Sequence, residues 1–71
     1  MKQIVEYHIS RLQDKNPEVR LKAIKELVLL NDVAALSALE EVFKNDSNED
    51  VRKVAQQAGR EIFLANRAKE S

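Results

Sequence analysis

The chain has 71 residues, of which 44% are hydrophobic, and it contains a single glycine and a single proline. Twelve basic residues balance twelve acidic ones, which argues against a dedicated nucleic-acid-binding protein. The lack of cysteine excludes disulfides and the single histidine excludes most zinc sites. No apolar run approaches the ~20 residues of a membrane span. We therefore expect one small, soluble, cytoplasmic domain over residues 1–71, largely helical and without a cofactor.

The first two predicted helices cover residues 2–13 and 17–30. In the first, Ile4, Val5, Ile9 and Leu12 fall on one helical face, and this is the pattern of an amphipathic helix. Asn16 and Pro17 then provide a helix start, because asparagine can accept from a free backbone N–H and proline at the first position loses no hydrogen bond.

The third and fourth predicted helices cover residues 33–44 and 49–66. Asn31-Asp32 ends the second helix, and Asp32 can cap the third. The turn Lys44–Asn48 is expected to be one residue longer than the turn Asp14–Pro17. Linkers this short make successive helices pack antiparallel, which gives two hairpins, repeat 1 (about 2–30) and repeat 2 (about 33–66).

The two inner helices begin with nearly the same sequence. Asn16-Pro17-Glu18-Val19-Arg20 leads to Ala23, and Asn48-Glu49-Asp50-Val51-Arg52 leads to Ala55, 32 residues later at every matched position. A fixed period of this size indicates a structural repeat in which one helical hairpin is copied and stacked. The predicted fold is all-α, a solenoid of two hairpins with four antiparallel helices.

These residues carry a resemblance to a known family. The run Leu12-x-Asp14-x-Asn16-Pro17-Glu18-Val19-Arg20-x-x-Ala23 and its second copy, which extends to Ala58-Gly59, resemble the turn and second helix of a HEAT repeat. The resemblance covers about residues 4–64, and the short period is similar to phycobilisome-lyase-type repeats. It implies that Asp14, Arg20, Asp46 and Arg52 lock one repeat to the next, with Asn45 as an alternative to Asp46. It also implies close helix packing at Gly59.

The expected function is that of a non-enzymatic protein–protein interaction or scaffolding module, because rigid helical pairs present binding surfaces without ordering loops. Its partner would be another protein, and the chain itself a monomer or weak homodimer. The residues expected on the contact face of the inner helices are Leu21, Lys25, Leu29, Lys53, Gln57 and Leu64.

Two alternatives remain open at this point. Lys53, Arg60 and Arg67 recur every seven residues and form a basic stripe on the fourth helix, which could contact a nucleic-acid backbone, although phosphate-driven binding needs several uncompensated cations. The phycobilisome-lyase resemblance suggests an accessory factor for tetrapyrrole attachment, with only Tyr7 and His8 as polar ring contacts. His8 itself is expected to be a hydrogen-bonded core residue.

The ends of the stack are expected to be polar, as in capping repeats, so that the chain is a complete unit. The polar residues expected there are Lys22, Lys25 and Glu26 on the second helix and Lys53, Gln56, Arg60 and Arg67 on the fourth. Leu29, Phe63 and Leu64 fall outside the core arcs. We expect them to close one end of the core; an exposed patch that favours a homodimer or a partner is the alternative.

Overall fold

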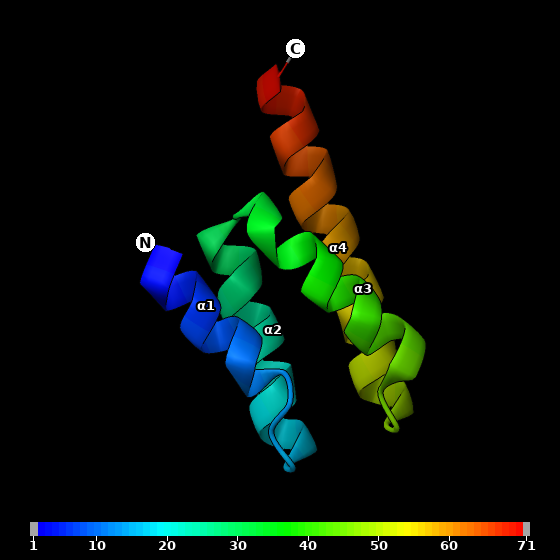
Figure 1. The fold of residues 1–71 in the computed structure, drawn as a ribbon. Coiled ribbons are helices and arrows are strands. Elements are labelled where there is room, and N and C mark those ends of the chain that lie inside the picture. Colours follow the sequence, from blue (N-terminus) through cyan, green and yellow to red (C-terminus); the bar gives the residue numbers. More distant parts are fainter. Residues whose placement is uncertain (1, 71) are drawn as a thin grey trace.

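The computed structural model of the chain describes residues 2–70, and the side chains of residues 2–67. Its helices are α1 (Lys2–Arg11), α2 (Pro17–Leu30), α3 (Leu36–Asn45) and α4 (Glu49–Glu70), and the 3-10 turn η1 (Val33–Ala35) leads into α3. Figure 1 shows two hairpins side by side, α1 with α2 and α3 with α4. The all-α fold and its stacked hairpins, predicted from the sequence, are confirmed.

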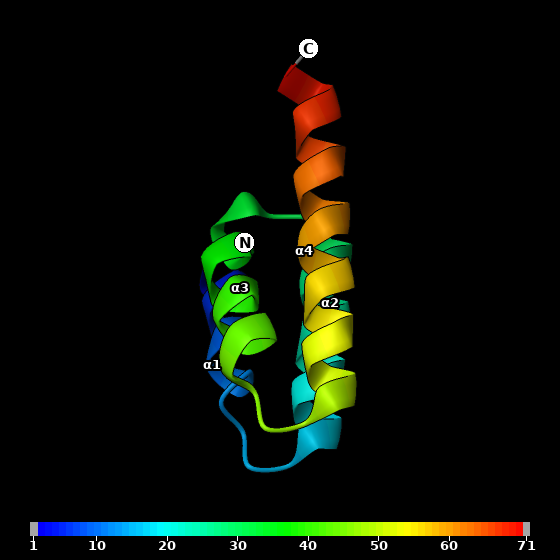
Figure 2. The ribbon, with the colours of Figure 1, turned by 90° about the vertical axis from the view of Figure 1, so that its right-hand side faces the viewer.

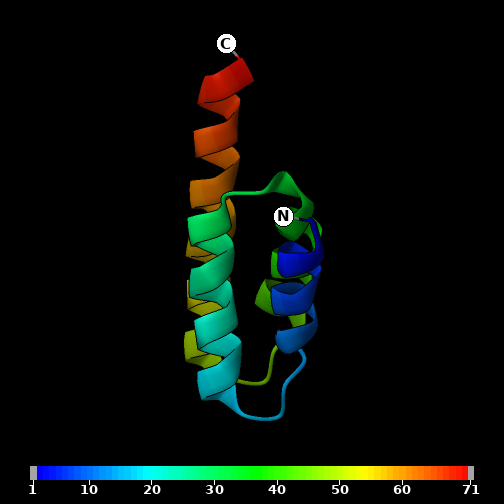
Figure 3. The same ribbon diagram turned by 90° about the vertical axis from the view of Figure 1, so that its left-hand side faces the viewer.

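The helices form two layers. Figures 2 and 3 show α1 and α3 in one layer and α2 and α4 in the other. Each hairpin therefore contributes one helix to each layer, and the inner helices of the two repeats, α2 and α4, pack against each other. This arrangement leaves one surface that runs across α2 and α4 on the side away from α1 and α3.

The predicted helix starts have the expected hydrogen bonds. The side chain of Asn16 accepts from the N–H of Glu18 at 2.9 Å, and proline occupies the first position of α2. Asp32 accepts from the N–H of Ala34 at 2.8 Å and so caps η1. Between them, Asn31 ends α2 with a left-handed backbone (φ 53°), and its N–H donates to the carbonyls of Leu27 and Val28. Asparagine tolerates this conformation better than most residues.

Several helix boundaries differ from the prediction. The first helix ends at Arg11 rather than 13, because the N–H groups of Leu12, Gln13 and Asp14 each donate to the carbonyl three residues back. This tighter turn leaves five residues, 12–16, between α1 and α2, whereas only Asp46–Asn48 separate α3 and α4. The expectation that the second turn is the longer one is therefore wrong. The fourth helix continues to Glu70 instead of ending at 66.

One apolar core joins the two hairpins. Both inner helices and both outer ones contribute buried apolar residues, and no polar residue among residues 2–67 is buried as a whole. Burying each large apolar side chain contributes about 1.5–3 kcal/mol. The buried residues are Val5, Leu12, Ala23, Ile24, Leu27, Ala35, Leu39, Val42, Val51, Ala55, Ala58 and Ile62.

Ile4 and His8, expected on the apolar side of the first helix, are not buried, and neither is Phe43 of α3. Ile4 and Phe43 are 47% and 39% exposed, because the sides of α1 and α3 on which they lie have no further hairpin against them. His8 is half-buried, and its Nδ1 has no hydrogen-bond partner among the described residues. The expectation of a hydrogen-bonded core histidine is therefore not met at this nitrogen.

The C-terminal part of α4 extends beyond the other helices in all three views (Figures 1–3). Asn66 attaches the start of this extension to the end of α2. Its Nδ2 donates to Asn31 Oδ1 at 3.1 Å, to the Asn31 carbonyl at 3.3 Å and to the Ile62 carbonyl at 2.8 Å. The Asn66 side chain thus provides hydrogen-bond donors for the Asn31 carbonyl and side-chain oxygen at the end of α2.

Candidate protein-interaction surface

The two repeats are joined by an ion pair that the turn sequences provide. Arg20 donates through Nη2 to Asp46 Oδ1 at 3.0 Å, and its Nε lies 2.9 Å from Asp46 Oδ2. The same guanidinium donates through Nη1 to the backbone carbonyls of Asp14 at 2.7 Å and Lys15 at 3.2 Å. The two side chains are 11% and 7% exposed, so solvent screens this pair less than a surface pair. Arg20 therefore connects its own turn to the turn of the next repeat.

The equivalent residues of the second repeat have the same local geometry. Arg52 Nη1 donates to the Asp46 carbonyl at 2.7 Å, as Arg20 does to Asp14. Asp46 Oδ1 accepts from the N–H of Asn48 at 2.9 Å, as Asp14 Oδ1 does from Asn16. Asp46, and not Asn45, thus occupies the position of Asp14. The 32-residue period holds through the whole turn.

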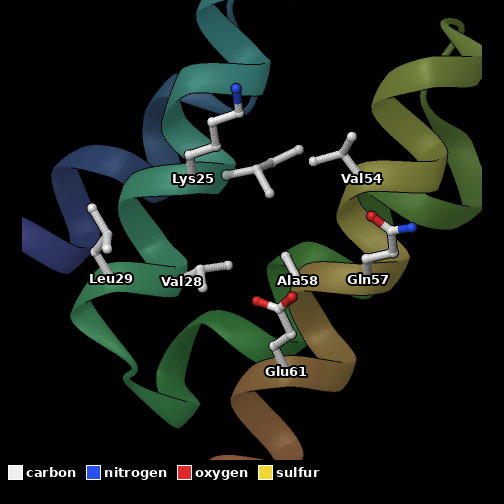
Figure 4. A pocket seen from close by; sticks show the side chains of 8 residues that line it. Lys25, Val28, Leu29, Val54, Gln57, Ala58 and Glu61 are labelled. Atoms are coloured by element: carbon white, nitrogen blue, oxygen red, sulfur yellow. The ribbon is translucent and has the colours of Figure 1, made fainter.

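A groove lies between the inner helices, on the surface away from α1 and α3. We call it the α2–α4 groove; its volume is about 290 Å³. From α2 it is lined by Ile24, Lys25, Val28 and Leu29, and from α4 by Val54, Gln57, Ala58 and Glu61. Figure 4 shows Val28 pointing from α2 toward α4 and Val54 pointing back toward α2. The floor is apolar, and the rim carries one cation, one anion and one amide.

The structure brings together three of the six predicted contact residues. Lys25, Leu29 and Gln57 line the α2–α4 groove. Leu21 is half-buried against the core, Lys53 forms an exposed ion pair with Glu49 at 3.0 Å, and Leu64 lies outside the groove lining. The predicted contact set missed the other five lining residues, which are Ile24, Val28, Val54, Ala58 and Glu61. The apolar Val54, three residues after the buried Val51, was a signal for it.

The basic stripe is partly neutralised. Lys53 pairs with Glu49, while Arg60 and Arg67 line two other hollows beside α3 and η1. Lys25 lies on the α2–α4 groove, not on the outer flank of α2 where the sequence analysis placed it as an end residue.

The expectation that Leu29, Phe63 and Leu64 close the core is wrong. They are 77%, 53% and 47% exposed. Nor do they form one patch, because Leu29 lines the α2–α4 groove and Phe63 lines a hollow between α3 and α4. This end of the stack carries both kinds of residue, because the exposed Gln56 and Arg60 line that second hollow together with Leu36, Phe43 and Phe63. Helical periodicity could not show which flank a neighbouring helix covers.

Close packing does not explain Gly59. A Cβ atom added there would meet nothing within 4 Å. Gly59 instead lies on the lining of the hollow between α3 and α4, beside Phe43 and Phe63. The implied packing role of this residue is therefore corrected.

Two stacked helical hairpins whose turns have the same hydrogen bonds 32 residues apart, joined by an arginine–aspartate pair, define an α-helical repeat protein. The family model described as HEAT repeats matches residues 1–59. The chain belongs to the HEAT-repeat family. No curated protein and no solved structure matches the chain. None of the helices described here is long and apolar enough to cross a membrane.

Proposed function

We propose that the chain is a non-enzymatic protein-binding module whose contact surface is the α2–α4 groove. The observation that carries the proposal is an apolar floor with a polar rim on two helices that the core holds rigidly. Val28 and Val54 provide apolar contact at the centre, and Lys25 and Glu61 provide charges of opposite sign at the margin. Interfaces combine an apolar centre with a polar rim in this way.

The groove suits one segment of a partner protein. A volume of about 290 Å³ accommodates a few side chains rather than a whole domain. Amphipathic helices place apolar side chains into grooves of this kind at spacings of three or four residues. We infer that the partner inserts such side chains between α2 and α4, with a carboxylate near Lys25 and a cation near Glu61. HEAT repeats in general mediate protein interaction, which supports this assignment of the class.

The test compares the capture of partner proteins by wild-type and variant chains. Tagged wild type, Lys25→Glu and Leu29→Glu are incubated with native lysate, with and without nuclease treatment, and bound proteins are identified by mass spectrometry. Lys25 and Leu29 are exposed, so these variants should fold. A partner retained by wild type should bind each variant at least about tenfold more weakly, because Lys25→Glu reverses a rim charge and Leu29→Glu places a charge at an apolar contact.

Lys15→Glu is the matched control, since Lys15 is equally exposed but lies in the turn before α2. It should retain the partner. Equal capture by all four chains would contradict the placement of the contact surface in the α2–α4 groove. Loss of every bound protein on nuclease treatment would contradict the proposal itself and favour the nucleic-acid alternative at Lys53, Arg60 and Arg67.

A further inference from the structure

The C-terminal end of the stack is an unfilled apolar surface with a charged margin. Its hollow, of about 310 Å³, lies between α3 and α4 on the flank away from the first hairpin. Leu36, Phe43 and Phe63 line it together with Gly59, and Glu40 and Arg60 stand at its margin. We call this set the C-terminal end face. The absence of a close neighbour at Gly59 leaves room there for side chains from another molecule.

Arg52 adds an unused ion-pair donor beside this face. In the first repeat the guanidinium of Arg20 makes two kinds of contact, one to its own turn and one to the carboxylate of Asp46. Arg52 makes the first kind, to the Asp46 carbonyl. None of the side chains of residues 2–67 provides the second, a carboxylate within ion-pair distance. Within this part of the chain, the guanidinium of Arg52 therefore lacks the carboxylate contact by which Arg20 reaches the next repeat.

The N-terminal end of the stack has the complementary groups. Asp14 accepts from the N–H of Asn16, as Asp46 does from Asn48, but within residues 2–67 no arginine reaches its carboxylate. Gln13, in the turn that follows α1, lines one hollow together with Glu41 and Val42 of α3, so this side of the first hairpin faces α3. Residues 4, 7 and 11 share one side of α1 by helical geometry, and we place this side at the outer end of the stack.

Residues 4, 7 and 11 of α1 combine exposed apolar groups with a positive charge. Ile4 and Tyr7 are 47% and 58% exposed, and the Arg11 guanidinium lies 5.5 Å from the centre of the Tyr7 ring. On α2, Ile24 and Val28 face α4, which places the exposed Glu26 on the outer flank. We call Ile4, Tyr7, Arg11, Asp14 and Glu26 the N-terminal end face.

We propose that the C-terminal end face of one copy binds the N-terminal end face of a second copy, in the same relation that joins the two hairpins within the chain. Arg52 then pairs with Asp14 of the second copy, as Arg20 pairs with Asp46. Phe43 and Phe63 pack against Ile4 and Tyr7, which removes exposed apolar area on both sides. This inference concerns the ends of the stack and does not depend on the α2–α4 groove.

The contact between α2 and α4 within the chain predicts which charged residues meet when a second copy stacks. Within the chain, Val28 of α2 lies across from Ala58 of α4 in the α2–α4 groove. The residues 32 positions after Val28 and 32 positions before Ala58 are Arg60 and Glu26. Stacking a second copy with the internal geometry therefore places Arg60 opposite Glu26 where the chain itself has an apolar pair. Opposite charges at matched positions favour a second copy as the occupant.

The arrangement must be head-to-tail. A two-fold symmetric contact between two C-terminal end faces would bring neither Asp14 to Arg52 nor Glu26 to Arg60, because both carboxylates lie on the N-terminal end face. Heterologous contacts of this type continue into open or closed assemblies larger than a dimer. The average mass should therefore rise with protein concentration and pass twice the chain mass of 8.1 kDa.

The test is sedimentation velocity of the full chain over a range of concentrations, with the charge-reversal variants Arg60→Glu and Glu26→Arg. Both residues are exposed, so the variants should fold, and circular dichroism verifies it. Each variant alone places like charges at the contact and should weaken self-association about tenfold or more. An equimolar mixture restores one opposite-charge pair at every contact and should associate as wild type does.

Lys25→Glu is the matched control, because it reverses an exposed charge in the α2–α4 groove and should leave self-association unchanged. A wild-type chain that stays monomeric at all concentrations would overturn the proposal, and so would a mass that stops at the dimer. Association that is lost in Lys25→Glu but retained in Arg60→Glu would also overturn it. That last result would leave the proposed partner groove intact, since it would place self-contact there.

Discussion

Gly59 lies in the interior of α4, where the backbone takes an ordinary helical conformation and no positive φ is recorded for glycine. Glycine costs helix stability because the unfolded chain has more freedom to lose. At a closely packed site this cost is offset by the approach of a neighbour, but no atom lies within 4 Å of the Cβ position. Nothing within the folded chain therefore requires glycine there.

We predict that Gly59→Ala stabilises the fold by about 0.5–1 kcal/mol, because alanine reduces the entropy of the unfolded chain and meets no obstacle. Urea or thermal unfolding monitored by circular dichroism measures this. Ala58→Gly on the same helix is the matched control, and it should destabilise because Ala58 is buried. A destabilised Gly59→Ala variant would show that close packing exists at this position after all.

At the scale of the element, α4 is the unusual helix, with 22 residues against 14 in α2. Where α2 ends at Asn31, the equivalent position of the second repeat is Phe63, and the helix continues. Asn66 holds this continuation through its bonds to Asn31 and Ile62. The side chains of Phe63 and Leu64 are exposed and bury little apolar area. The hydrogen bonds of Asn66 are therefore the main contact that holds the extension against α2.

Asn66→Ala should loosen the end of α4 and cost about 1 kcal/mol, since it removes side-chain hydrogen bonds at a half-buried site. Hydrogen–deuterium exchange should then rise in peptides beyond Ile62 and change little before Ala55. Gln57→Ala, at an exposed position of the same helix, serves as the control and should leave the exchange pattern as it is. Unchanged exchange in Asn66→Ala would mean that helix propensity alone holds the extension.

The molecule as a whole depends on contacts between its two repeats. The core is shared by both hairpins, and two repeats are fewer than stacked arrays usually need for stability. The Arg20–Asp46 pair adds a polar link at one end of that shared core, and it is the pair in which both side chains are nearly covered. Removing one partner leaves a poorly hydrated charge on the other.

Arg20→Ala and Asp46→Ala should each destabilise the fold by roughly 1–3 kcal/mol, and the double variant should cost less than the sum of the two. Equilibrium urea unfolding of the four chains gives the coupling energy. The same cycle on Glu49 and Lys53, an exposed pair, should give a coupling of about 0.5 kcal/mol or less. Strict additivity at Arg20 and Asp46 would show that the ion pair does not join the repeats.

The sequence by itself determined the repeat, because Asn16, Asp32 and Asn48 act on neighbouring backbone groups and apolar periodicity acts within one helix. Helix order, caps and most of the core follow from such local rules. Only the tertiary structure decided which flanks are covered: that Arg20 reaches Asp46, that Val28 and Val54 enclose a groove, and that Phe43 and Phe63 stay exposed. Coverage depends on where a distant helix lies, and no pattern within a single helix contains that information.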